Sequence, residues 1–315
     1  MLKYFIKRFL RSILTLFMVI TVVFLLMRLM PEEGYFGEQG IDKLDFEQKE
    51  AILEGMGLRD PLHTQLKNFY LDLARGDLGE SIVYRPKVPI SEIIVKKIPY
   101  SVYFGLVALG ISLIFGLYMG VVMAREKDRV KDKLGTGYVV FIRAVPPIVY
   151  YLFIQIYITK LLKLPILFDI DEPMSWILPA VSMSLGSIAG YAMWMRRYMV
   201  DELNKDYIKL ARAKGLSNRK IMIKHVMRNA FVPMAQYLPA SILFTISGSI
   251  YIESLFSIPG MGGLLVDAIQ RQDNNLVQAL VLIYSSVGII GLFLGDMLMA
   301  LVDPRIKLQK HGGGR

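Results

Sequence analysis

The sequence predicts an all-α integral membrane protein with about six transmembrane helices. Hydrophobic residues make up 54% of the 315 residues, and the mean hydropathy is +0.44, which exceeds what a soluble domain of this length needs. The apolar residues form long continuous runs, which favour helices over the short alternating strands of a barrel. The net charge of +10 comes from basic residues beside these runs, a pattern that indicates orientation in a bilayer rather than binding to nucleic acid.

Six segments have about the 20 mostly apolar residues that a helix needs to cross a bilayer. The predicted spans are 9–30, 98–124, 138–162, 174–195, 231–251 and 276–302. The first span has a basic start, as a signal peptide has. Its apolar run is unbroken and no small-residue cleavage site follows it, so we expect residues 1–30 to be an uncleaved N-terminal transmembrane helix.

The distribution of basic residues between the connections predicts the orientation. The 125–137 connection carries five Lys or Arg residues and the 196–230 connection carries ten, whereas 163–173 and 252–275 carry one each. The positive-inside rule therefore places the first two connections, and both termini, on the cytoplasmic side.

Residues 31–97 are then an external insert between the first two spans. Its segments 47–53 and 62–73 have the apolar spacing of helices, and several glycines separate them. Two interpretations remain open: a small cap on the outer mouth of the protein, or a docking surface for a protein that delivers substrate.

The 196–230 connection predicts two helices joined by a sharp turn. Gly215 suits the left-handed position just past a helix end, Leu216 can close over the last turn, and Ser217 suits the N-cap of the next helix. An apolar stripe with small residues precedes the turn: Tyr207, Ile208, Leu210, Ala211 and Ala213. The pattern fits either an amphipathic helix on lipid headgroups or a short helix in the groove of a partner protein.

The segment from Asp206 to Ser217, Asp-Tyr-Ile-Lys-Leu-Ala-Arg-Ala-Lys-Gly-Leu-Ser, resembles the cytoplasmic coupling loop of ABC importer permeases. It is most similar to the dipeptide, oligopeptide and nickel branch. The general motif is Glu-Ala-Ala, three residues, then Gly. Ala211 and Gly215 match it, whereas Lys209 and Leu210 stand where Glu and the first Ala are usual.

Further segments carry the same resemblance in the same order along the chain. They are Gly-Leu-Arg-Asp-Pro-Leu-His at 57–63, Arg-Gly-Asp-Leu-Gly at 75–79, Glu-Ser-Leu-Phe-Ser-Ile-Pro-Gly-Met-Gly at 253–262 and Asp-Pro-Arg at 303–305. They are similar to the B-type peptide-permease subunit, which has a long first external loop. The resemblance implies a type I ABC importer permease fold with a core at 98–307 and a coupling loop at 196–230. Residues 308–315 would be a tail, either a cloning remnant or the natural end.

The resemblance also implies the function and the partners. The chain would form half of the pathway of an ATP-driven importer in the cytoplasmic membrane of a bacterium or archaeon. It would pair with a second, related permease, with one or two cytoplasmic ATPases and with an external substrate-binding protein. Oligopeptides are the leading cargo; dipeptides, nickel chelates and oligosaccharides are the alternatives. The residues expected to contact the ATPase are Tyr207, Leu210, Ala211, Ala213, Lys214, Gly215, Leu216 and Ser217.

No catalytic residue, metal ligand or cofactor is assigned to this chain. It lacks the Gly-x-x-x-x-Gly-Lys-[Ser/Thr] phosphate loop, so ATP and Mg²⁺ would be bound by the partner ATPases. An intramembrane enzyme is a poor alternative, because the three histidines lack ligand spacing and there is no Gly-x-Ser-x-Gly elbow. An ion-coupled secondary transporter would need carboxylates and repeats inside the membrane. Only Asp296 and Arg143 are charged at membrane depth, and no substrate-binding residue is assigned.

Prolines inside the predicted spans are either hinges or simple packing features. They are Pro146, Pro147, Pro179, Pro233 and Pro239. Each lacks a backbone donor, so each is expected to bend its helix.

Overall fold

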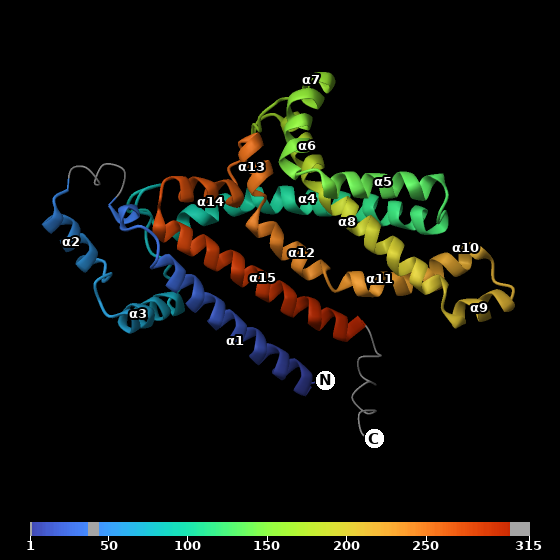
Figure 1. Ribbon diagram of the computed structural model, residues 1–315, viewed down its shortest axis with the longest axis horizontal. Coiled ribbons are helices and arrows are strands. Elements are labelled where there is room, and N and C mark those ends of the chain that lie inside the picture. The colour runs from blue at the N-terminus through green and yellow to red at the C-terminus, as the bar shows by residue number, and fades with distance from the viewer. Residues whose placement is uncertain (1, 37–43, 303–315) are drawn as a thin grey trace.

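The computed structural model describes residues 2–36 and 44–302, which are almost entirely helical. Four continuous helices are long and apolar enough to cross a membrane, and they run roughly along the long axis of the molecule (Figure 1). They are α1 (Leu2–Met27), α4 (Ile90–Arg125), α8 (Ile177–Leu203) and α15 (Asn274–Val302). These helices confirm the first, second, fourth and sixth predicted spans. However, α4 begins before residue 98 and α8 continues past residue 195, so both take residues assigned to the neighbouring connections.

The third predicted span is not continuous. It consists of α5 (Val130–Ala144), α6 (Pro147–Phe153), a π-helical turn and α7 (Thr159–Leu162), with a bend of 106° after α5. Val145 is extended, as the residue before a proline usually is, and Pro146 and Pro147 cannot donate the next helical hydrogen bonds. The bend expected at Pro146 and Pro147 is therefore confirmed, but it divides the segment predicted as one span over 138–162 into separate helices. Helices α6 and α7 project from the body of the molecule, with α13 beside α6 (Figure 1).

The fifth predicted span is bent but present. Residues 218–235, which end in α11 (Arg228–Ala235), meet α12 (Leu238–Phe244) and its extension to Ser247 at 48°. Pro239 lies in the first turn of α12. By contrast, Pro179 lies in the first turn of α8, where a proline is tolerated and bends nothing.

The predicted outer loop at 252–275 is instead largely helical. It contains α13 (Ile250–Phe256) and α14 (Met261–Gln270), which meet at 84° and together are apolar enough to pass as a broken span or a re-entrant loop. The described chain thus has four continuous spans, and up to seven if each bent pair counts as one. The predicted number of about six lies within this range.

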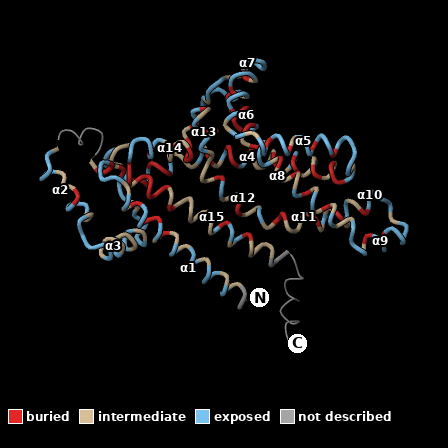
Figure 2. Tube along the Cα trace, in the orientation of Figure 1, coloured by how far each residue is buried: buried red, intermediate tan, exposed pale blue. Residues whose placement is uncertain are grey.

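The core lies where α4 and α8 cross and where α13, α14 and the first half of α15 pack on them (Figure 2). Gly116 and Gly120 allow α4 and α8 to approach closely. A Cβ atom on Gly120 would lie 2.6 Å from the Ala192 carbonyl oxygen, so no larger residue fits without movement.

The external insert consists mainly of α2 (Phe46–Gly55) and α3 (Leu62–Ala74), at the opposite end of the molecule from α9 (Asp206–Ala213) and α10 (Asn218–Ile221) (Figure 1). The Asp45 side chain caps α2. Tyr70 of α3 stacks on Phe17 of α1, with ring centroids 5.0 Å apart. The insert is therefore packed along the first span. The Asp-Pro-Arg segment and the tail at 308–315 lie outside the described residues.

Candidate functional site

The turn after α9 has the backbone geometry that the sequence predicts. Gly215 has a φ of +74°, its N–H donates to the Arg212 carbonyl at 2.9 Å, and the Leu216 N–H donates to the Ala211 carbonyl at 3.2 Å. These two bonds close the end of α9 around a left-handed residue. The Ser217 hydroxyl accepts from the Lys220 N–H at 3.4 Å and caps α10. The predicted conformational roles of Gly215 and Ser217 are thus confirmed.

Apolar side chains anchor α9 to the end of α8. Ile208 and Ala211 of α9 and Ile221 of α10 are buried in one cluster with Met195 and Met199 of α8. Tyr207 adds polar contacts at the start of α9. Its hydroxyl donates to the Glu202 carboxylate and accepts from the Asn229 amide at 2.9 Å. The apolar residues lie on α9 as predicted, but Ile208 and Ala211 pack against the chain itself, whereas Leu210 and Ala213 are exposed.

The outward face of α9 and its turn is exposed. Of the residues expected to contact an ATPase, five are exposed: Leu210, Ala213, Lys214, Gly215 and Ser217. Tyr207 and Leu216 are half-buried. Ala211 is buried against the chain itself, with 6% of its surface exposed. Ala211 therefore lies behind the exposed face, in the apolar cluster with Met195 and Met199, and its contact with an ATPase stays a prediction.

An ion pair joins the start of α5 to α8, at a point about two turns before α8 ends. Arg196 donates to both carboxylate oxygens of Asp132, at 2.6 and 2.7 Å, and Asp132 also accepts from the Asp128 N–H at 2.8 Å. The side chain of Asp132 is 4% exposed. A bidentate pair of this kind fixes orientation as well as distance. In the sequence Arg196 is only one of ten basic residues of the 196–230 connection, and nothing there indicates its pair with Asp132.

Farther from α9, the Glu253 carboxylate holds the corner between α13 and α14. It accepts four hydrogen bonds: from the Ser101 hydroxyl at 2.8 Å, and from the N–H groups of Ser249, Gly262 and Gly263 at 3.1, 2.7 and 3.1 Å. Gly260 allows this approach, because a Cβ atom there would lie 2.4 Å from the carboxylate. Glu253 thus connects α13 and α14 to α4.

A second buried carboxylate fastens the external insert to the core. One oxygen of Asp273 accepts from the Ser81 hydroxyl at 2.6 Å and from the N–H groups of Ile82, Val83 and Tyr84 at 3.0 to 3.1 Å. Its other oxygen accepts from the Leu276 N–H at 3.1 Å, at the start of α15. Asp273 is fully buried. Neither Asp273 nor Glu253 was identified as a structural centre from the sequence.

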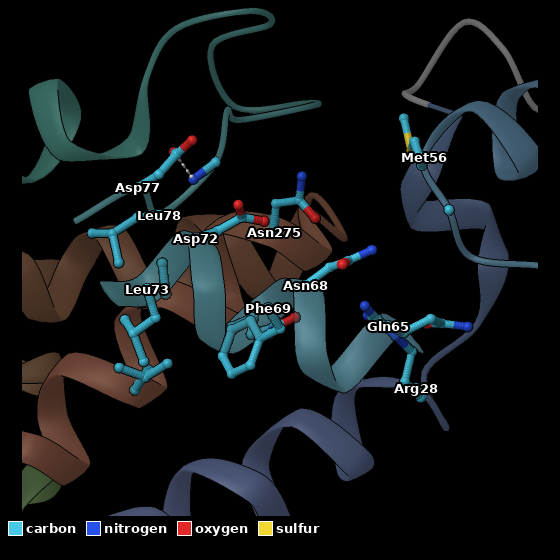
Figure 3. Close-up of a pocket in the computed structure, with 15 residues that line it drawn as sticks. Arg28, Met56, Gln65, Asn68, Phe69, Asp72, Leu73, Asp77, Leu78 and Asn275 are labelled. Carbon is cyan, nitrogen blue, oxygen red and sulfur yellow. Dashed lines mark hydrogen bonds between the residues drawn. The ribbon is translucent and has the colours of Figure 1, made fainter. Parts of the chain in front are cut away.

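A polar cavity of about 210 Å³ separates α3 from the ends of α1 and α15 (Figure 3). Arg28 and Asn275 line it, together with Gln65 and Asn68 of α3. The Arg28 guanidinium donates to the Gln65 side chain at 2.7 Å. The insert is therefore fixed to the spans on both sides of a small cavity, an arrangement that serves a cap or a docking surface equally well.

The two charges expected at membrane depth have different surroundings. Asp296 of α15 pairs with Arg8 of α1 and accepts from the Gln236 amide at 3.1 Å. This pairing brings the start of α1 and the end of α15 to the same side of the molecule, as an even number of crossings requires. Arg143 is exposed at the end of α5. Asp296 thus has a structural partner inside the chain.

Comparison with known proteins agrees with this geometry. Residues 112–308 match the family described as binding-protein-dependent transport system inner membrane component. The chain is 33% identical to the dipeptide transport system permease protein DppB of Bacillus subtilis, over 99% of the chain and 100% of the relative. It is 31% identical to the oligopeptide transport system permease protein OppB of Haemophilus influenzae, over 98% and 100%.

A solved amino acid ABC transporter has a similar fold. Its TM-score is 0.51 at 13% identity, over 68% of this chain and 94% of that one. The family match covers more than half of the chain and includes α8 to α15, with the turn at Gly215 among them. The protein is therefore a membrane-embedded transport subunit, and it belongs to the binding-protein-dependent transport system inner membrane component family.

Proposed function

We propose that this chain forms one half of the translocation pathway of an ATP-driven importer of short peptides. Oligopeptides are the first candidate cargo and dipeptides the second. The two relatives described above are named for these cargoes, and each aligns over its full length. This agreement favours peptides over nickel chelates and oligosaccharides.

The observation that carries the proposal is the exposed turn of α9 at one end of the molecule. Leu210, Ala213 and Lys214 face outward, whereas Ile208 and Ala211 fix the helix to α8. An exposed apolar and basic helix of two turns, held from behind, is suited to fill a groove in a partner. The partner is a cytoplasmic ATPase, and movement of α9 would be transmitted to α8 and α11.

The assembly would contain this chain, a second related permease, one or two ATPases and an external substrate-binding protein. ATP and Mg²⁺ would be bound by the ATPases, and this chain would bind no cofactor. The insert at 31–97 would face outward, and the connection at 196–230 would face the cytoplasm. Nucleotide would then bias the spans between two packings, one open to each side.

Reconstitution tests the proposal. We expect the complex purified from its native membrane to contain a second permease and one or two ATPases. In proteoliposomes it should accumulate a labelled pentapeptide only when the binding protein and ATP are both present. Uptake without ATP, or purification of the chain alone in a transporting form, would contradict the proposal.

Orientation is tested separately. The chain contains no cysteine, so a single Asp45→Cys or Gly215→Cys substitution introduces a unique thiol. An impermeant reagent added outside cells should label position 45 but not position 215. The reverse pattern would overturn the assigned orientation.

A further inference from the structure

A groove of about 320 Å³ lies between α8 and the bent pair α11–α12. Ser187, Gly190, Tyr191 and Trp194 line one wall and belong to one face of α8, at spacings of three and four residues. Tyr237 and Ser241 line the opposite wall. The Tyr191 and Ser241 hydroxyls lie 3.1 Å apart and connect the two walls.

The rings of this groove are available to a ligand. Tyr237 is 55% exposed and Trp194 is 39% exposed. A Cβ atom built on Gly190 meets no atom within 4 Å, so the space above this glycine is open. Trp194 and Tyr198 stack with ring centroids 5.7 Å apart, which orders this part of the aromatic surface.

The chemistry of the groove suits a peptide. None of the described residues that line the groove is charged, although the Arg197 guanidinium lies over the Trp194 ring, 5.4 Å from its centroid. The hydroxyls and the indole N–H can pair with main-chain amides. The exposed Tyr237 ring can pack against apolar side chains of the peptide or accept its amino-terminal cation. Lipid tails offer no hydrogen-bond partner to such groups, so a polar aromatic face within the spans is better suited to line a wet passage.

The position of the groove connects it to α9. Helix α8 leads directly into α9, and the chain returns from α10 through a π-helical turn (Met222–Met227) into α11. The two walls are therefore the two elements on either side of the segment assigned to the ATPase. A displacement of α9 would change the width of the groove.

We propose that this groove is the cargo-binding surface that the chain contributes to the pathway. It holds a short peptide through its main-chain amides and apolar side chains rather than through its charges. The inference rests on the proposed peptide import and assigns binding residues to it. Contacts to amides and ring faces are shared by peptides of many sequences, and their modest strength allows release on the far side.

Photo-cross-linking tests the assignment. A pentapeptide that carries benzophenone is first shown to be taken up by the whole reconstituted complex, and lack of uptake would refute the proposed cargo itself. The complex is then irradiated during ATP-driven uptake. We expect adducts on residues 187–198 and 234–241. Adducts elsewhere only, or a Ser241→Cys variant that cross-links mainly to the second permease, would overturn the inference while leaving peptide import intact.

A plug in the groove provides the functional test. Gly190→Trp should fill the open space and lower peptide uptake by about tenfold or more, while the complex still assembles. Gly110→Trp is the matched control, because Gly110 of α4 also has no atom within 4 Å of its Cβ position and does not line the groove. Normal uptake by the Gly190→Trp complex would overturn the assignment.

Discussion

The end that carries the external insert and the end that carries α9 are held by different kinds of contact. On the side of the insert, Glu253 at the α13–α14 corner and Asp273 under the insert are buried carboxylates that accept four and five hydrogen bonds, several of them from segments far apart in the chain. At the second end, α9 is held mainly by apolar side chains such as Ile208 and Met199, with Tyr207 as its polar contact, and its tip is exposed. Hydrogen bonds to a fixed carboxylate specify direction, whereas apolar contacts do not.

This difference indicates that the insert side of the molecule is fixed, whereas α9 can move. The corner of α13 and α14 and the attachment of the insert can hardly move without leaving buried N–H groups unpaired, which is costly. Helix α9 can tilt or slide over Met195 and Met199 at small cost, because methionine side chains adapt to new packing. A movable segment at the α9 end and a fixed frame at the other suit the proposed importer, in which an ATPase acts on α9.

The largest effect is expected from Glu253→Ala. The substitution leaves the Ser101 hydroxyl and three N–H groups without their acceptor, and the summed loss should lower the free energy of unfolding by about 3–5 kcal/mol. Thermal unfolding of the purified protein in mild detergent measures it. Glu172→Ala is the control, because Glu172 is exposed and its change should stay within about 0.5 kcal/mol. Equal stability of the two variants would contradict the fixed-frame interpretation.

Asp273→Ala should have a smaller effect, about 2–4 kcal/mol, because the insert is also packed on α1. The local consequence is more specific. Hydrogen exchange should become faster at the amides of residues 82–84, which lose their shared acceptor. Asp267→Ala, at an exposed position of α14, should leave these amides protected. Unchanged exchange in the Asp273 variant would show that this carboxylate does not hold the insert.

Gly215→Val should cost only about 1–2 kcal/mol of local stability, since no atom lies within 4 Å of its Cβ position and the penalty comes from the positive φ alone. The loss of peptide uptake should be larger than this small loss of stability would suggest. We expect ATP hydrolysis to persist while peptide uptake is lost, because the tip of α9 is displaced. Gly215→Asn tolerates the left-handed region and should retain uptake. Normal uptake by the valine variant would refute the coupling assignment.

The smallest effect concerns an exposed ion-pair cluster of the insert. Arg59 donates to Glu50 at 2.6 and 2.8 Å and to Glu32 at 2.7 and 3.1 Å. These hydrogen bonds lower the pKa of the Glu50 carboxyl below its usual 4.5. The contribution to stability is therefore complete above this value and is lost as the pH falls through the lowered pKa.

Limited digestion with pepsin measures this effect. Cleavage within α2 should increase when the pH is lowered from about 5 to about 3. Glu50→Gln cannot titrate, so its cleavage should depend less on pH over the same interval. Identical profiles for the two proteins would show that the cluster contributes nothing to the stability of the insert.

Local sequence signals were sufficient for much of the fold. Continuous apolar runs predicted α1, α4, α8 and α15, and Gly215 with Ser217 predicted the turn after α9. The two consecutive prolines at 146 and 147 predicted a bend after α5, although the apolar run over 138–162 did not reveal that the bend reaches 106°. The α13–α14 pair was predicted as a loop because each helix is too short to cross a membrane alone.

By itself the sequence determined which segments are apolar enough to enter a membrane, where α9 turns, and which family the chain resembles. Each of these depends on neighbouring residues or on a pattern along the chain. Only the tertiary structure decided that Asp273 meets the segment at Ser81, that Ala211 faces inward, and that the aromatic face of α8 opposes Tyr237. These contacts join positions far apart in the chain. Side-chain spacing along one helix does not reveal what packs against it.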